Sequence, residues 1–151
     1  MANTQAMCTS FKTEILDGIH ALGTTVIRAG TGADTLKAAL YLASATVNAA
    51  TTAYSASGEV SGTNYSAGGI TATNANQPAN SGTTAYWTPS ASFTYTNVTL
   101  TTAFDAVLIY NSTQSNKAIS VHTFGSQTVT AGTFVLSMPT SDASTGLLRI
   151  A

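Results

Sequence analysis

The segment from Phe104 to Phe124 constrains the fold more than any other part of the chain. Its first run, residues 104–110, carries apolar side chains on both alternating faces, which predicts a central strand covered on both sides. Six polar, turn-forming residues follow at 111–116, and residues 117–124 then alternate between apolar and polar. A strand, a polar loop and a second strand predict a β-hairpin. Because this segment is the most strongly apolar part of the chain, we expect other strands to pack against it.

Short apolar or alternating runs elsewhere predict further strands between Gly-, Asn- and Pro-containing turns. They are expected at residues 24–29, 35–42, 70–73, 84–87, 92–96, 98–100, 101–110, 127–130, 133–138 and 147–150. The pair 127–130 and 133–138 is expected to form a second hairpin around Ala131 and Gly132. For residues 35–42 a helix is the alternative, since Leu and Ala are good helix formers. Many short strands in 151 residues predict one mainly-β domain, an antiparallel β-sandwich or barrel-like fold.

Two stretches between these strands are expected to be irregular. Glycines punctuate residues 58–69, which predicts tight turns or a close approach of two backbones. Residues 74–84 are rich in Asn, Gly and Ser, and they are expected to form a mobile surface loop.

Residues 3–18 predict one amphipathic α-helix at the N-terminus. Its apolar face recurs every four residues and is widened by two neighbours; the set is Met7, Phe11, Ile15 and Ile19, with Cys8 and Leu16. Asn3 or Thr4 is expected to cap the start and Gly18 to end the helix. The charged side chains are expected off this face: Lys12, Glu14 and Asp17. Burying an apolar side chain gains about 1.5–3 kcal/mol of hydrophobic stabilisation, so we expect this stripe to be buried on the chain's own sheet or against a neighbour.

Charge is scarce. Only 7% of the residues are charged and the formal net charge is -1, whereas an ordinary soluble domain has roughly 25% charged residues. A nearly neutral surface with few charges favours association, so an assembled or adhesive protein fits best. The five Lys and Arg residues are scattered, and apolar runs are short, so neither nucleic acid nor membrane is an expected partner. The N-terminus lacks the pattern of a signal peptide, which predicts synthesis and folding in a cytoplasm.

The titratable residues form no recognisable catalytic or metal-binding pattern. Cys8 and His20 would lie about 18 Å apart along a helix, beyond hydrogen-bond reach, so they make no nucleophile pair. A single cysteine excludes an internal disulfide, and the two histidines have no suitable carboxylate spacing for a metal. His122 lies in a predicted strand and is expected to be structural. The sequence therefore predicts a protein that is not an enzyme and holds neither a metal nor a cofactor.

The aromatic residues allow two interpretations. Exposed rings could stack on sugars, as in a carbohydrate-binding β-sandwich module, or the same rings could pack in the core and at interfaces, which is the commoner outcome. The residues concerned are Tyr54, Tyr65, Tyr86, Trp87 and Tyr95. We favour packing, and we add Tyr86 and Trp87 to the helical stripe Met7, Phe11, Ile15 and Ile19 as candidate interface residues.

Four groups of segments carry a family resemblance. They are 1–8 (MANTQAMC) with 10–12 (SFK); 36–37 (LK) with 39–41 (ALY) and 45–46 (AT); 59–62 (EVSG) with Tyr65 and 68–69 (GG); and 108–112 (LIYNS) with 116–118 (NKA) and 124–126 (FGS). In these segments the chain resembles small virion proteins of tailed bacteriophages. It departs from them by a longer segment at 23–32 and an Asn-rich insert near 74–80.

The resemblance implies a structural role in the virion and no chemistry. A capsid decoration or cement protein is the first expectation, and a tail or fibre-attachment protein is the second. The partners it implies are the capsid or other virion proteins and further copies of the chain, with a trimer expected by analogy with other decoration proteins. Assembly would take place in the cytoplasm of the bacterial host.

Overall fold

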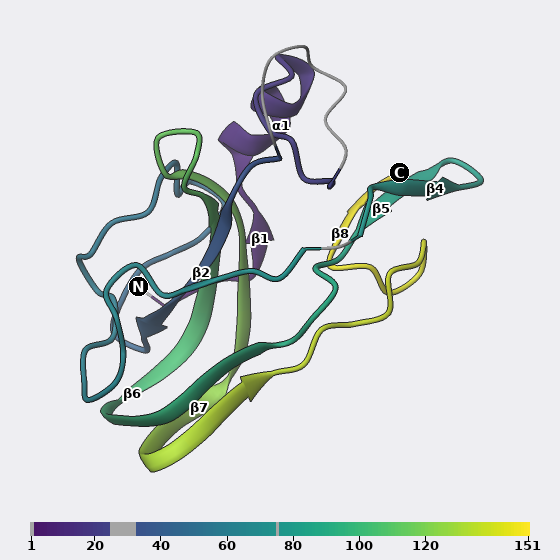
Figure 1. The fold of residues 1–151 in the computed structure, drawn as a ribbon. Coiled ribbons are helices and arrows are strands. Elements are labelled where there is room, and N and C mark those ends of the chain that lie inside the picture. Colours follow the sequence, from purple (N-terminus) through teal and green to yellow (C-terminus); the bar gives the residue numbers. More distant parts are fainter. Residues whose placement is uncertain (1, 25–32, 75) are drawn as a thin grey trace.

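The chain is mainly β, as the sequence predicts, and is built from two antiparallel sheets (Figure 1). The computed structural model describes residues 2–24, 33–74 and 76–151. The five-stranded sheet has the order β1 (Ala6–Met7), β7 (Lys117–Leu136), β6 (Phe93–Asn111), β2 (Leu36–Leu42) and β3 (Ile70–Thr71). The three-stranded sheet has the order β4 (Ala79–Ser81), β5 (Thr84–Trp87) and β8 (Leu148–Ile150). The described residues also include one short helix, α1 (Thr9–Leu16), and neither sheet closes on itself.

The predicted central hairpin is confirmed, and it is much longer than predicted. β6 and β7 pair from Asn111 opposite Lys117, next to the turn, to Phe93 opposite Leu136 at the far end. The separate strands predicted within 92–110 and within 117–138 are therefore one strand on each side. The second hairpin around residues 131–132 is wrong, because Gly132 pairs with Val98 of β6. Irregular residues that look like turns in the sequence are bulges here, which bend a strand without ending it.

A pair of opposed bulges folds this hairpin back over the sheet. Between Leu100 and Phe104, β6 advances by four residues while β7 advances by two. Between Phe104 and Ala106 the reverse holds, since β6 advances by two residues and β7 by four. Figure 1 shows both strands turning sharply at the lower left. The far half of β6 thereby reaches β2, where the Tyr95 hydroxyl donates to the carbonyl of Ala38 at 2.9 Å. On β7, the ring of Phe134 lies 5.0 Å from that of Phe104.

The core lies on both sides of β6 and β2. Residues 106–111 of β6 are all buried, as expected for a central strand covered on both faces. Residues 36–42 form strand β2 and not the alternative helix. The glycine-punctuated segment approaches β2 closely, as predicted: Gly69 has φ +68°, and a Cβ there would lie 1.7 Å from the carbonyl oxygen of Ala38.

The N-terminal helix is shorter than predicted. It begins at Thr9 and not near residue 3, because the preceding residues are extended and β1 pairs with β7. Asn3 caps no helix: its side chain donates to the Leu42 carbonyl and to Asp105, and accepts from the Val47 amide. Sheet pairing and these bonds give the extended backbone partners that the local helical period does not reveal. The end was predicted correctly, since Gly18 adopts φ 68° and its amide donates to Ile15.

The apolar face of the helix is only partly as predicted. Phe11 is 1% exposed, but Leu16, expected on the same face, is 88% exposed. Glu14, expected off the apolar face, is buried. Met7 lies on β1 and Ile19 lies beyond the helix, so the four-residue period crosses three different conformations. Glu14 is buried and Leu16 is exposed because the side chains of His20 and Lys117 bind the Glu14 carboxylate.

The remaining predicted elements are partly confirmed. Strands at 35–42, 70–73, 84–87 and 147–150 correspond to β2, β3, β5 and β8. The surface loop predicted at 74–84 is wrong in part, because β4 forms within it and pairs with β5. Residues 25–29 of the strand predicted at 24–29 lie outside the described residues. Within the described parts of the chain, no helix has the length and apolar character needed to span a membrane.

Candidate functional site

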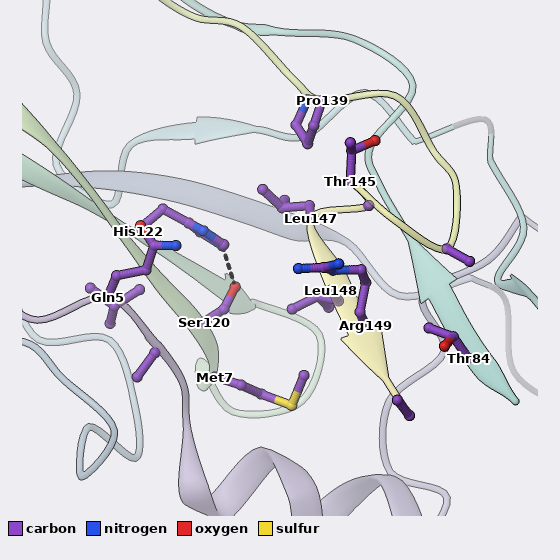
Figure 2. Close-up of a pocket in the computed structure, with 15 residues that line it drawn as sticks. Gln5, Met7, Thr84, Ser120, His122, Pro139, Thr145, Leu147, Leu148 and Arg149 are labelled. Atoms are coloured by element: carbon purple, nitrogen blue, oxygen red, sulfur yellow. Dashed lines mark hydrogen bonds between the residues drawn. The ribbon is translucent and has the colours of Figure 1, made fainter.

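A polar cavity lies between the two sheets, where β1 and β7 face β8 (Figure 2). Its volume is about 610 Å³. Ser120 and His122 project into it from β7; they are two residues apart, so both side chains lie on the same face of the strand. Ser120 Oγ lies 2.9 Å from His122 Nε2. Arg149 reaches in from β8 on the opposite wall, and Met7 of the predicted stripe lines the cavity from β1.

The Ser120–His122 pair resembles two members of a nucleophilic triad, although no nucleophile motif in the sequence predicts it. Its environment does not equip it for catalysis. Burial lowers the pKa of His122 to about 4, so the imidazole is a weak base at neutral pH. Among the described residues, Ser120 is its one hydrogen-bond partner, and no carboxylate orients it as the third triad member does. Strand alternation at positions 120 and 122 is the sequence signal that could have paired them.

Acid should destabilise the folded chain through His122. A histidine whose pKa falls from 6.5 to about 4 on folding binds more protons when unfolded, so its contribution to stability is lost as pH falls between these values. We expect a loss of about 2–3 kcal/mol by pH 4 that is absent in His122→Gln. Urea unfolding of both proteins at several pH values measures it. Ser120→Ala is the matched control, since it keeps the buried imidazole and should lose stability in acid as the wild type does. An equal loss of unfolding free energy between neutral pH and pH 4 in the wild type and in His122→Gln would contradict the prediction.

An apolar pocket of about 240 Å³ lies on the other side of β8. Four of the six candidate interface residues line it: Phe11, Ile15, Tyr86 and Trp87. Ile150 also lines this pocket, whereas its neighbour Arg149 lines the polar cavity. The alternation of side chains along β8 therefore separates an apolar pocket from a polar one.

The predicted interface residues differ in how much of them reaches solvent. Phe11 and Trp87 pack inside the subunit, and the Trp87 indole donates to the Asn76 carbonyl at 3.3 Å. Met7, Ile15, Ile19 and Tyr86 are half-buried. The large apolar side chains that are most exposed among the described residues are Leu16, which was expected on the buried face, and Val135 and Ile150, which are about half exposed.

Most of the other tyrosines surround a buried carboxylate, Glu59. Its oxygens accept hydrogen bonds from the hydroxyls of Tyr54 at 2.6 Å and Tyr65 at 2.8 Å, and from the amide of Gly68 at 2.8 Å. Burial, together with the bond to Glu59, raises the pKa of Tyr65 far above its ordinary value. All these donors are neutral. Their hydrogen bonds, together with the bond from the Leu40 amide to the Tyr65 hydroxyl, hold the segment around residues 54–68 against the sheet.

Aromatic stacking in this cluster is internal. The rings of Tyr54 and Tyr110 stack at 4.8 Å, and those of Tyr65 and Tyr95 at 5.9 Å. Tyr95 and Trp87 are buried, so packing is confirmed as the correct interpretation for these two residues. Their ring faces are not available to a sugar.

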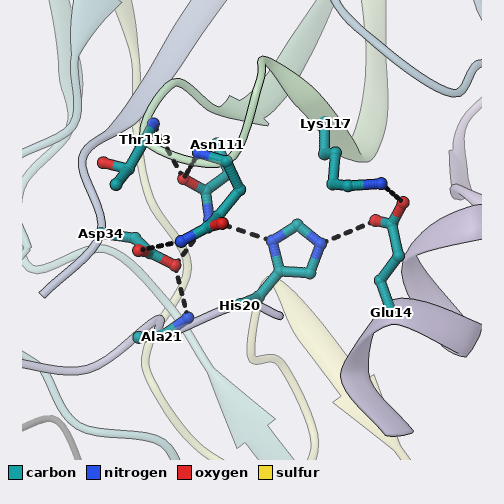
Figure 3. A network of polar contacts seen from close by, with 8 residues as sticks. Glu14, His20, Ala21, Asp34, Asn111, Thr113 and Lys117 are labelled. Atoms are coloured by element: carbon teal, nitrogen blue, oxygen red, sulfur yellow. Dashed lines mark hydrogen bonds and ion pairs between the residues drawn. The ribbon is translucent and has the colours of Figure 1, made fainter. Parts of the chain in front are cut away.

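A second polar network ties α1 to the turn between β6 and β7 (Figure 3). Glu14 receives the Lys117 ammonium at 2.6 Å and lies 2.8 Å from His20 Nε2. Asn111 Nδ2 meets His20 Nδ1 at 3.0 Å and Asp34 at 2.8 Å. Although burial acts to raise it, the hydrogen bonds from Lys117 and His20 hold the pKa of Glu14 below its ordinary value. The members lie far apart in sequence, so no local pattern could have predicted the network.

The sulfur and nitrogen ligands that a metal would need are not brought together. Burial raises the pKa of the Cys8 thiol to about 11, which keeps it protonated and unreactive. His20 is engaged by Glu14 and Asn111. Across residues 2–24, 33–74 and 76–151, no three His, Cys, Asp or Glu side chains are grouped so as to hold a metal ion.

Comparisons of the chain with protein-family models, with curated proteins and with solved structures find no match. Function is therefore inferred below from the chain's own geometry, charge and sequence.

Proposed function

We propose that the chain is a structural protein of a bacteriophage virion, and in the first place a capsid decoration or cement protein that stabilises the head by protein–protein contacts. It acts through its surfaces and not as an enzyme, and it associates with further copies of itself, as a trimer in the simplest arrangement. A role in the tail or in fibre attachment is the alternative within the virion. The resemblance to small virion proteins of tailed phages supports the virion setting.

The observation that carries the proposal is the exposure of apolar side chains on a surface with few charges. Leu16 is 88% and Ile150 is 47% exposed, and Ile150 borders the apolar pocket beside β5. Because only 7% of the residues are charged, charge repulsion does little to prevent this surface from associating with other proteins. Contact with another protein would remove these side chains from water, which is favourable at about 25 cal/mol per Å².

The interior of the chain suits the same role. The folded-back hairpin and the buried polar network around Asn111 connect segments distant in sequence, so the surfaces are held in fixed relation to one another. The Ser120–His122 pair, with a base of pKa about 4, gives little support to a catalytic role. Burial of Trp87 and Tyr95 likewise leaves the glycan-binding alternative without its principal stacking platform.

The number of copies per virion tests the proposal. Quantitative mass spectrometry of purified phage particles should detect the chain in numbers comparable to those of the major capsid protein, which amount to hundreds per head. A few copies per particle would favour the tail alternative. Absence from particles that are otherwise complete would refute the virion role.

A further inference from the structure

We propose that the polar cavity between β7 and β8 binds a small organic acid, a single carboxylate with a short apolar tail. This site goes beyond the proposed structural role and does not depend on it. Its volume of about 610 Å³ lies in the range of pockets that hold small molecules.

The charge of the cavity selects an anion. Arg149 extends from β8 into the space between the sheets, toward the Ser120–His122 pair (Figure 2). Arg149 is an exposed residue, and one of its Nη atoms donates to the carbonyl of Ser144, which leaves other N–H groups free to donate. Of the described residues that line the cavity, none is Asp or Glu. A planar guanidinium in this position is suited to a carboxylate, which it can bind through two parallel hydrogen bonds.

The opposite wall supplies a second polar contact. Ser120 is 1% exposed, yet it lines the cavity, and its hydroxyl is held by His122. The imidazole is neutral at pH 7, so it can carry its proton on Nε2 and donate to Ser120 Oγ. The hydroxyl hydrogen of Ser120 is then free to donate to a carboxylate oxygen.

The remaining walls set the size and charge of the ligand. Met7 and Leu147 contribute apolar surface, which suits a short hydrocarbon tail. A phosphate carries a second negative charge, and within the described part of the chain Arg149 is the one Lys or Arg side chain that lines the cavity. The site therefore favours a monoanion with an apolar part over inorganic phosphate.

Calorimetric titration of the full chain at pH 7, in a buffer free of carboxylates, tests the site with hexanoate as the probe. We expect saturable binding at one site, with hexanamide and inorganic phosphate each at least tenfold weaker. Arg149→Gln should weaken hexanoate binding at least tenfold, and Ser120→Ala several-fold. Arg149→Lys keeps the positive charge but cannot donate two parallel hydrogen bonds, so its affinity for hexanoate should be intermediate.

The control is Lys12→Gln, which removes the same charge from an exposed position on α1 outside the cavity and should leave the affinity unchanged. Melting curves of each variant establish that it is folded; should Arg149→Gln not fold, Arg149→Lys and Ser120→Ala carry the test. No hexanoate binding by the wild type overturns the proposal. So do equal affinities for hexanoate and hexanamide, tighter binding of phosphate, or an affinity that Arg149→Gln leaves unchanged.

Discussion

Replacing Asn111 by leucine is expected to lower the free energy of unfolding by about 3–5 kcal/mol. Asn111 is 0% exposed and lies at the end of β6, where both ends of its amide are bonded. Its oxygen accepts from the amides of Thr113 and Gln114, and its nitrogen donates to Asp34 and meets His20. Leucine has the same number of side-chain heavy atoms in the same branched arrangement, so no cavity forms and the expected loss comes chiefly from buried polar groups left without partners. Urea unfolding monitored by circular dichroism measures the change.

Two further variants separate this cause from a general effect of leucine. Asn80→Leu makes the same replacement at an exposed position on β4, where we expect a change within about 0.5 kcal/mol. Asn111→Asp keeps the acceptor for Thr113 and Gln114 but sets a second carboxylate against Asp34, so it should also destabilise, and less so at low pH where one carboxyl is protonated. If Asn111→Leu unfolds within about 1 kcal/mol of the wild type, the network does not stabilise the fold in the manner inferred.

The variant Phe104→Ala is expected to cost about 3–5 kcal/mol through the cavity that it leaves. Phe104 is fully buried at the bend of the hairpin. Its ring contacts Phe134 on the far half of β7 at 5.0 Å and Phe124 at 6.0 Å, both edge-to-face. The ring thus links the two halves of the folded hairpin, and its loss should loosen the fold-back as well as the core.

Companion variants show whether this link is specific. Phe124 is only half-buried, so Phe124→Ala should cost clearly less than Phe104→Ala. A double-mutant cycle between Phe104 and Phe134 should give a coupling of about 0.5–1.5 kcal/mol, as for other edge-to-face pairs. A cycle with no coupling would mean that the far half of the hairpin is held by other contacts, such as the bond from Tyr95 to Ala38.

Local pattern was informative where a segment's environment is the same along its length. Residues 107–110 are apolar on both faces because β6 is covered on both sides, and the sequence shows this directly. Gly18 ends α1 because glycine tolerates a positive φ, which is also a local property. Local pattern failed at Asn3 and Glu14, whose partners lie about 40 to 100 residues away.

The sequence by itself determined the class of the fold, the position of its central hairpin, and the near absence of charge from its surface. These follow from the alternation of side chains and from composition, which need no knowledge of distant contacts. The tertiary structure decided that bulges bend the hairpin instead of breaking it, and that the helix starts at Thr9. It also decided that Ser120, His122 and Arg149 share one cavity. The physical reason is that backbone and side-chain polar groups take whichever partners the folded chain brings within reach, and those partners are distant in sequence.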